Sequence, residues 1–145
     1  PLRTKKDVEA IKAALVDGTL DVIATDHAPH HYDEKNVEFE KAPFGIVGLE
    51  TSFGLSFTQL YKSGLLSKMQ LIEKMSTKPA EILDIEKGDL SVGKVADITL
   101  IDPKASYTVT KETFAGKSKN SPFIGMTLQG EVVCTLVAGK RVYEK

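Results

Sequence analysis

The sequence predicts an α/β fold in which one buried parallel strand lies between helices and a β-rich tail follows. Residues 20–25 form an almost wholly apolar run that does not alternate, as in a strand covered on both faces. Helical periodicity precedes and follows this run, and after Asp84 short β-type segments are separated by turn residues. We therefore expect two parts, residues 1–83 with the strand and helices and residues 84–145 with the β-rich segment.

Composition indicates a soluble globular chain and does not favour any particular macromolecular partner. Of the 145 residues, 41% are hydrophobic and 27% are charged, and the formal net charge is −1. This balance gives no electrostatic footprint for nucleic acid or an anionic membrane, and no apolar run approaches the roughly 20 residues that span a bilayer. The single cysteine, Cys134, excludes an internal disulfide and fits a reducing compartment. We expect a cytoplasmic protein that binds neither nucleic acid nor membrane.

Capping patterns and helical periodicity predict four helices before residue 84. Thr4 and Ser67 each begin a capping-box pattern, whereas Gly18 and Gly64 follow the last periodic residues of two helices. Thr77 is expected to cap the last helix separately. The second helix is expected over residues 49–63.

Four strands are predicted in the tail, and turn signals separate them. The last two strands are joined by Ala138-Gly139 and are expected to form a closing hairpin. The predicted strands cover residues 98–101, 107–109, 131–137 and 140–143.

The buried strand at residues 20–25 has no predicted parallel neighbour. Only a helix precedes Leu20, so the backbone groups of this strand would lack partners in an isolated chain. The chain also begins at Pro1 instead of methionine. We therefore expect it to be a segment of a longer protein.

The most informative motif is Asp-His-Ala-Pro-His at residues 26–30, directly after the apolar strand. Catalytic groups lie at the carboxyl ends of strands in open and closed parallel sheets. Asp26 can bind a divalent metal or transfer a proton, although taken alone it is as readily a turn residue. Pro29 stiffens the turn and His30 adds a second polar group, so we expect an anion-binding site.

A long segment without periodicity, residues 32–46, follows this motif. A loop of this length beside a strand end is commonly a lid or binding loop, and its charged side chains are interpreted as solvated surface. Gly45 permits close backbone approach to a ligand and Phe44 can exclude water, with a structural turn as the competing interpretation. His27 is expected to pack or hydrogen-bond and His31 to be exposed, both without a catalytic role.

Two segments carry a family resemblance. Val-Ile-Ala-Thr-Asp-His-Ala-Pro-His at residues 22–30 and Ala-Pro-Phe-Gly-Ile-Val-Gly-Leu-Glu at residues 42–50 closely resemble the last barrel strand and following loop of bacterial-type dihydroorotases. Residues 1–3 and 120–125 are similar to further segments of that family, and the glycine and aspartate pattern at residues 88–97 recurs across amidohydrolases. The resemblance covers essentially the whole chain, as the C-terminal third of such an enzyme.

The resemblance implies a fold and an activity. The fold is a metal-dependent (β/α)8 TIM barrel, with residues 1–83 as its last part and residues 84–145 as part of a small β-sandwich domain. The activity is the reversible cyclisation of N-carbamoyl-L-aspartate to L-dihydroorotate, with loss of water, in de novo pyrimidine biosynthesis.

The resemblance also implies site roles. Asp26 is expected to bind the metal and act as general base and acid, His30 to bind the substrate carboxylate, and Phe44 and Gly45 to contact the dihydroorotate ring. The stretch from Asp33 to Lys41 would form part of a lid. The implied cofactor is zinc, as one or two ions in the full-length enzyme. Because the other implied ligands lie upstream, we expect this chain alone neither to retain zinc nor to catalyse the reaction.

Alternatives remain at this stage. One is another cyclic amidohydrolase, a hydantoinase or allantoinase, and another is a non-catalytic dihydroorotase-like subunit that supports aspartate transcarbamoylase. The presence of Asp26 and His30 favours an enzyme over such a subunit. A small-molecule substrate is expected as the partner, with a homo-oligomer and an aspartate transcarbamoylase complex both left open.

Overall fold

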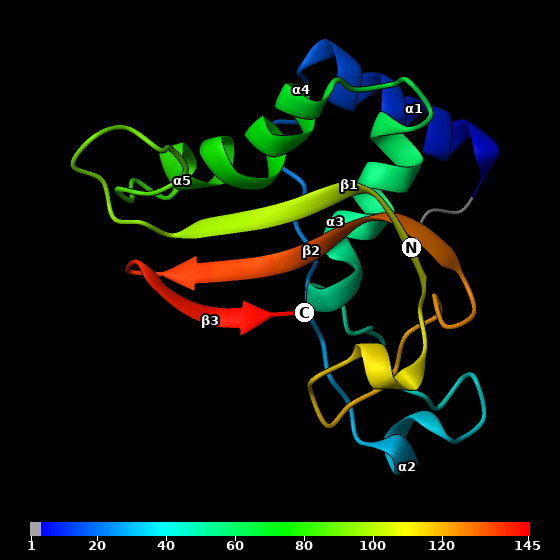
Figure 1. Ribbon diagram of the computed structural model, residues 1–145. Coiled ribbons are helices and arrows are strands. Elements are labelled where there is room, and N and C mark those ends of the chain that lie inside the picture. The colour runs from blue at the N-terminus through cyan, green and yellow to red at the C-terminus, as the bar shows by residue number, and fades with distance from the viewer. Residues whose placement is uncertain (1–3) are drawn as a thin grey trace. The chain divides into compact units, whose positions relative to one another are not determined.

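The computed structural model describes residues 4–145, so the family-like segment at residues 1–3 lies outside the described residues. The chain forms two compact units (Figure 1). The first contains the chain up to Ala24 together with residues 59–100 and 132–145, and the second contains residues 25–58 and 101–131. The domain division expected near residue 84 stays a prediction.

The first helix, α1 (Lys5–Asp17), is confirmed together with both of its end signals. The Thr4 hydroxyl accepts a hydrogen bond from the Asp7 amide at 3.2 Å, and the Asp7 carboxylate accepts one from the Thr4 amide at 2.8 Å. This capping box satisfies amides that lack partners within the helix. Gly18 ends the helix in the left-handed region, at φ +85°.

A short helix follows Thr77 as expected, but Thr77 does not cap it with its side chain. A helical run begins at the predicted Ser67 capping box and continues without a break through α4 (Lys68–Ile72), the π-helical turn η2 (Glu73–Thr77) and α5 (Lys78–Ile82). Thr77 has helical dihedral angles and makes no capping bond. Its hydroxyl instead donates to the Gly88 carbonyl at 3.0 Å, so a tertiary contact uses the group that was expected to cap.

The second predicted helix forms as α3 (Leu49–Ser56), which continues into the π-helical turn η1 (Phe57–Tyr61). Gly64, at φ +78°, donates its amide hydrogen to the Tyr61 carbonyl and ends this run as expected. A short helix, α2 (Tyr32–Lys35), lies within the long segment that had no periodicity.

Residues 20–25 do not form the expected strand. A parallel strand is defined by hydrogen bonds to neighbouring strands, and within residues 4–145 this run has none. Two of its backbone groups bond to the helical run instead: the Ile23 amide donates to the Lys74 carbonyl at 3.0 Å, and Lys74 Nζ donates to the Leu20 carbonyl at 2.6 Å.

The tail forms a three-stranded sheet in the order β1 (Ile98–Thr108), β2 (Thr127–Val137), β3 (Lys140–Glu144). The predicted closing hairpin is confirmed, since β2 and β3 pair antiparallel and Ala138 and Gly139 both have positive φ, as a two-residue hairpin turn requires. The two strands expected before residue 110 are one strand, because β1 lies at the sheet edge, where Pro103 is tolerated.

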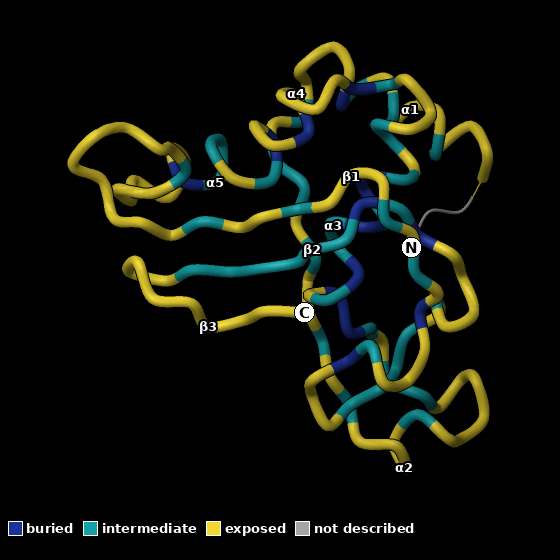
Figure 2. Tube along the Cα trace, viewed as in Figure 1, coloured by how far each residue is buried: buried dark blue, intermediate teal, exposed yellow. Residues whose placement is uncertain are grey.

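The second unit contains a buried apolar cluster. Val47, Val109, Phe114 and Leu128 are each at most 2% exposed and pack with half-buried Leu55 and Tyr107. Burial raises the pKa of Tyr107, with a smaller contribution from the nearby Glu131 carboxylate. In Figure 2 the β3 strand is exposed along its length, in contrast to this cluster. Among the described helices, none is long and apolar enough to cross a membrane.

Candidate functional site

Asp26 lies in a strained turn and presents a free carboxylate. Its φ is +44°, in the left-handed region that aspartate visits more readily than most residues other than glycine. The residue is exposed, and within residues 4–145 its carboxylate makes no hydrogen bond or ion pair. Backbone strain recurs at functional sites, so the position is compatible with a ligand-binding role.

His30 and Phe44, two of the predicted site residues, are brought together by the fold. The imidazole Nε2 of His30 lies 2.9 Å from the Phe44 carbonyl oxygen. Because a carbonyl only accepts, Nε2 carries the proton in this bond. The other ring nitrogen, Nδ1, lies 3.3 Å from the carboxylate of Glu34. The half-buried ring therefore links α2 to the loop that carries Phe44.

Gly45 fits its position because another residue would collide there. Its φ is +120°, and a Cβ atom at this position would lie 2.5 Å from the Cβ of Ala28. The turn at residues 26–30 and the loop at Gly45 thus lie in direct contact, and the hydrogen bond from the Ala28 amide to the Ile46 carbonyl at 2.8 Å and the parallel bridge between His27 and Ile46 join their backbones.

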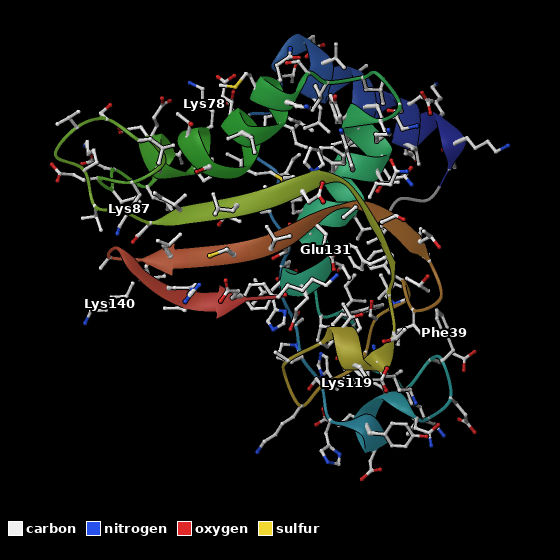
Figure 3. All side chains as sticks on the ribbon, viewed as in Figure 1. Phe39, Lys78, Lys87, Lys119, Glu131 and Lys140 are labelled. Atoms are coloured by element: carbon white, nitrogen blue, oxygen red, sulfur yellow. The ribbon has the colours of Figure 1, made fainter. Side chains whose placement is uncertain are left out.

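The side chain of Phe44 and the amides of the Phe44-Gly45 pair remain available. Phe44 is 92% exposed, and Phe39 on the same loop is 90% exposed. Figure 3 labels Phe39. In the described part of the chain, neither the Phe44 amide nor the Gly45 amide has a hydrogen-bond acceptor. The pair can therefore donate two hydrogen bonds to a ligand and cover it with an aromatic ring.

His27 and His31 have the structural roles expected for them. Nδ1 of His27 accepts a hydrogen bond from the Gly48 amide at 3.1 Å, which places the ring proton on Nε2 and fixes the start of α3. His31 is exposed and caps α2 through its Nδ1, which accepts from the Asp33 amide. Neither ring is drawn into the cluster around His30.

Sequence reasoning missed two residues that hold this loop. Lys35 was interpreted as solvated surface, which is wrong: its Nζ is half-buried and donates to the carbonyls of Pro43 and Gly45 at 2.8 and 3.2 Å. The tight turn leaves these carbonyls without backbone donors, and the Lys35 ammonium group donates to them instead. Asn120 also donates to the Gly45 carbonyl. The family-like segment at residues 120–125 gave a signal for Asn120, whereas the sequence gave none for Lys35.

The described residues do not assemble a metal site by themselves. Nowhere in residues 4–145 do three or more histidine, cysteine, aspartate or glutamate side chains gather closely enough to hold an ion. Catalytic zinc in proteins takes three protein ligands and an open position. Asp26 offers one ligand of suitable chemistry, and a complete set needs donors beyond those described.

The chain is similar to dihydroorotases in sequence. It is 58% identical over 143 residues to the dihydroorotase of Trichlorobacter lovleyi, covering 99% of this chain and 33% of the relative. With the dihydroorotase of Geobacter metallireducens the identity is 56% over 145 residues, covering 100% of this chain and 34% of the relative. The chain therefore spans about a third of the length of the curated relatives it matches.

Solved structures of related enzymes share its fold. L-hydantoinase (dihydropyrimidinase) from Arthrobacter aurescens matches with a TM-score of 0.93 at 34% identity, covering 100% of this chain and 33% of that one. Dihydropyrimidinase from Brevibacillus agri matches with a TM-score of 0.92 at 31% identity, covering 99% and 32%. The model of the amidohydrolase family matches residues 2–142. Since this match takes in nearly all of the sequence, the chain belongs to the amidohydrolase family.

Proposed function

We propose that this chain is the C-terminal part of a dihydroorotase, which interconverts N-carbamoyl-L-aspartate and L-dihydroorotate in pyrimidine biosynthesis. The observation that carries the proposal is the identity of 52–58% with proteins named dihydroorotase, over essentially the whole chain. The solved hydantoinases share only 27–34% identity over the same length. A cytoplasmic location is part of the proposal.

In this proposal Asp26 is the acid–base residue of the reaction. A divalent metal, which we propose to be zinc, lowers the pKa of a water molecule when it is bound. In the hydrolytic direction the Asp26 carboxylate accepts a proton from the attacking water and returns it to the departing ring nitrogen. In ring closure it moves the proton the other way. Its exposure and its lack of a partner within residues 4–145 suit this role.

His30, Phe44 and Gly45 are proposed to bind the substrate. Since His30 Nε2 already donates to the Phe44 carbonyl, the substrate carboxylate would accept a hydrogen bond from Nδ1–H of the imidazolium form and replace the Glu34 carboxylate there. The free amides of Phe44 and Gly45 would donate to the ring. The stretch from Asp33 to Lys41, with exposed Phe39, would form part of the lid.

The first experiment assays the intact enzyme on dihydroorotate, hydantoin and allantoin. We expect turnover of dihydroorotate to exceed that of the other two substrates. Preference for hydantoin would favour the second candidate, a hydantoinase, which the structural match to L-hydantoinase supports. The isolated 145-residue chain, in contrast to the intact enzyme, should show no turnover and no tight zinc binding, because its described residues lack a set of three metal ligands.

Asp26→Asn tests the acid–base role. The substitution keeps the shape of the side chain but removes the proton acceptor, so kcat in the intact enzyme should fall at least about 100-fold. Asp21→Asn makes the same chemical change on an exposed residue of the same segment and should leave kcat unaltered. A normal kcat for Asp26→Asn at full metal occupancy would refute the role.

His30→Ala tests substrate binding separately from chemistry. Loss of a charge-assisted contact to the substrate carboxylate should raise KM at least about tenfold and change kcat less. An unchanged KM would show that His30 serves the loop structure only.

A further inference from the structure

We propose that Asn120 is a positioning residue of the active site, which holds the turn at residues 26–30 against the Phe44-Gly45 loop. This inference rests on the proposed function for the identity of the substrate, but the contacts that carry it do not. Asn120 bonds to the backbone of Ala28, His30 and Gly45 and acts through the position that it gives to these residues.

One side-chain amide joins the two segments. Asn120 Nδ2 donates to the carbonyl of Ala28 at 3.0 Å and to that of Gly45 at 3.2 Å. Its Oδ1 accepts from the amide of His30 at 3.3 Å. The two carbonyls and the amide belong to the turn and the loop that carry the proposed substrate contacts.

The backbone of Asn120 adds a fourth bond. Its carbonyl accepts from the amide of Val47 at 3.2 Å. Val47 is 2% exposed and belongs to the buried apolar cluster of the second unit. The core therefore fixes the position of Asn120, and the side-chain amide of Asn120 holds the loop relative to that core.

The chemistry of the contact requires an amide. An asparagine side chain presents two donor hydrogens and one acceptor oxygen in one plane, which matches the two carbonyls and one amide that surround it. Aspartate has the same shape but would place a second acceptor against the carbonyls of Ala28 and Gly45. An unmade bond to a partly buried carbonyl is costly.

Lys35 and Asn120 both bond to Gly45 but hold different parts of the site together. Lys35 donates to the Gly45 carbonyl, but Lys35 and its acceptors belong to the same loop. Lys35 therefore stabilises the loop internally. Asn120 lies 75 residues from Gly45 and 92 from Ala28, and it sets the spacing between loop and turn, on which the geometry of His30 and Gly45 depends.

The test compares Asn120→Asp with Gln59→Glu in the intact enzyme. Both variants replace an amide by a carboxylate, and Gln59 is exposed and outside the site. We expect Asn120→Asp to raise KM for dihydroorotate about tenfold, as the loss of one or two hydrogen bonds predicts, with kcat changed less than about threefold. Gln59→Glu should leave both constants unaltered. An unchanged KM for Asn120→Asp would overturn the proposal.

A double-mutant cycle separates positioning from a general loss of stability. If Asn120 acts through the substrate contact of His30, the effects on KM of Asn120→Asp and His30→Ala should be less than additive in the double variant. Fully additive effects would contradict the proposed role.

Amide hydrogen exchange without substrate keeps the inference distinct from the proposed function. The amide of Ala28, which donates to the Ile46 carbonyl at 2.8 Å and so joins the turn to the loop, should exchange about tenfold faster in Asn120→Asp than in Gln59→Glu, while the amides in the middle of α1 stay equal. Faster exchange in an enzyme that does not turn over dihydroorotate would support the positioning role of Asn120 and refute the proposed substrate. Equal exchange in an enzyme that turns over dihydroorotate would refute the positioning role of Asn120 without contradicting the proposed function. Asn120→Ala, measured in the same way, serves if Asn120→Asp does not fold.

Discussion

The loops of the candidate site and the β2–β3 hairpin are held in place by different kinds of contact. The site loops depend on residues far away in the sequence, above all Asn120, and on a core in which Val47 is 2% exposed. The hairpin depends on neighbours in the sequence, with a two-residue turn and an ion pair between Arg141 and Glu144. All five residues of β3 are exposed.

This difference separates specification by tertiary contacts from specification by local geometry. A hairpin whose turn residues favour positive φ can form with few packed side chains. A binding loop with free amides and a strained aspartate needs external support, since strained backbone persists only where the surroundings determine it. Changes to the core should therefore affect the site region far more than equivalent changes affect the hairpin.

The largest effect is expected from Leu128→Ala. Leu128 is fully buried in the cluster of the second unit, and removing its side chain should lower the free energy of unfolding by about 2–5 kcal/mol. Val142→Ala in β3, where the side chain is 62% exposed, should change it by less than about 0.5 kcal/mol. Denaturant unfolding measures both. Equal losses would mean that the hairpin is packed as tightly as the core.

The next comparison is Gly45→Ala with Gly18→Ala, in which the two losses of stability should differ by about 1–3 kcal/mol. Both glycines have positive φ, so each substitution introduces backbone strain of about 1–2 kcal/mol. At Gly18 a new Cβ would meet no atom within 4 Å, whereas at Gly45 it would collide with Ala28. Overpacking should add about 1–3 kcal/mol at Gly45. Similar losses of stability for the two variants would show that the loop can move away from the turn.

Local signals in the sequence predicted local structure well. The Thr4 capping box, the glycine stop at Gly18 and the closing hairpin are formed as expected, because each depends on residues within a few positions of one another. The cap predicted at Thr77 does not form, for the opposite reason. The Thr77 hydroxyl has a partner eleven residues away, and no capping pattern reveals such a partner.

The site shows the same limit. Spacing and resemblance selected His30, Phe44 and Gly45, and the fold brings these three together. The bonds that hold them were not predicted, because Lys35 resembles any surface lysine and the family-like segment that contains Asn120 gave no indication of acceptors 75–92 residues away. The strand at residues 20–25 was predicted from apolar character alone, but a strand also requires hydrogen-bonded neighbours.

The smallest expected effect concerns Asp97, which connects to the hairpin turn through Ala138. The hydrogen bond from the Ala138 amide to Asp97 Oδ1, at 2.7 Å, lowers the pKa of this carboxyl. The ion pair with Lys87, a residue labelled in Figure 3, lowers it further.

A carboxyl whose pKa is lower in the folded state stabilises the fold fully above its unfolded pKa, about 3.9. This stabilisation is lost as the pH falls through the folded value. Asp97→Asn should therefore lower Tm at pH 7, and the difference from the unsubstituted protein should shrink as the pH falls below about 4. Lys87→Gln removes only the ion pair and keeps the amide bond, the larger cause of the shift, so its effect on Tm should be the smaller of the two. A Tm difference for Asp97→Asn that stays constant down to pH values well below about 4 would show that the carboxylate does not stabilise the hairpin turn through its charge.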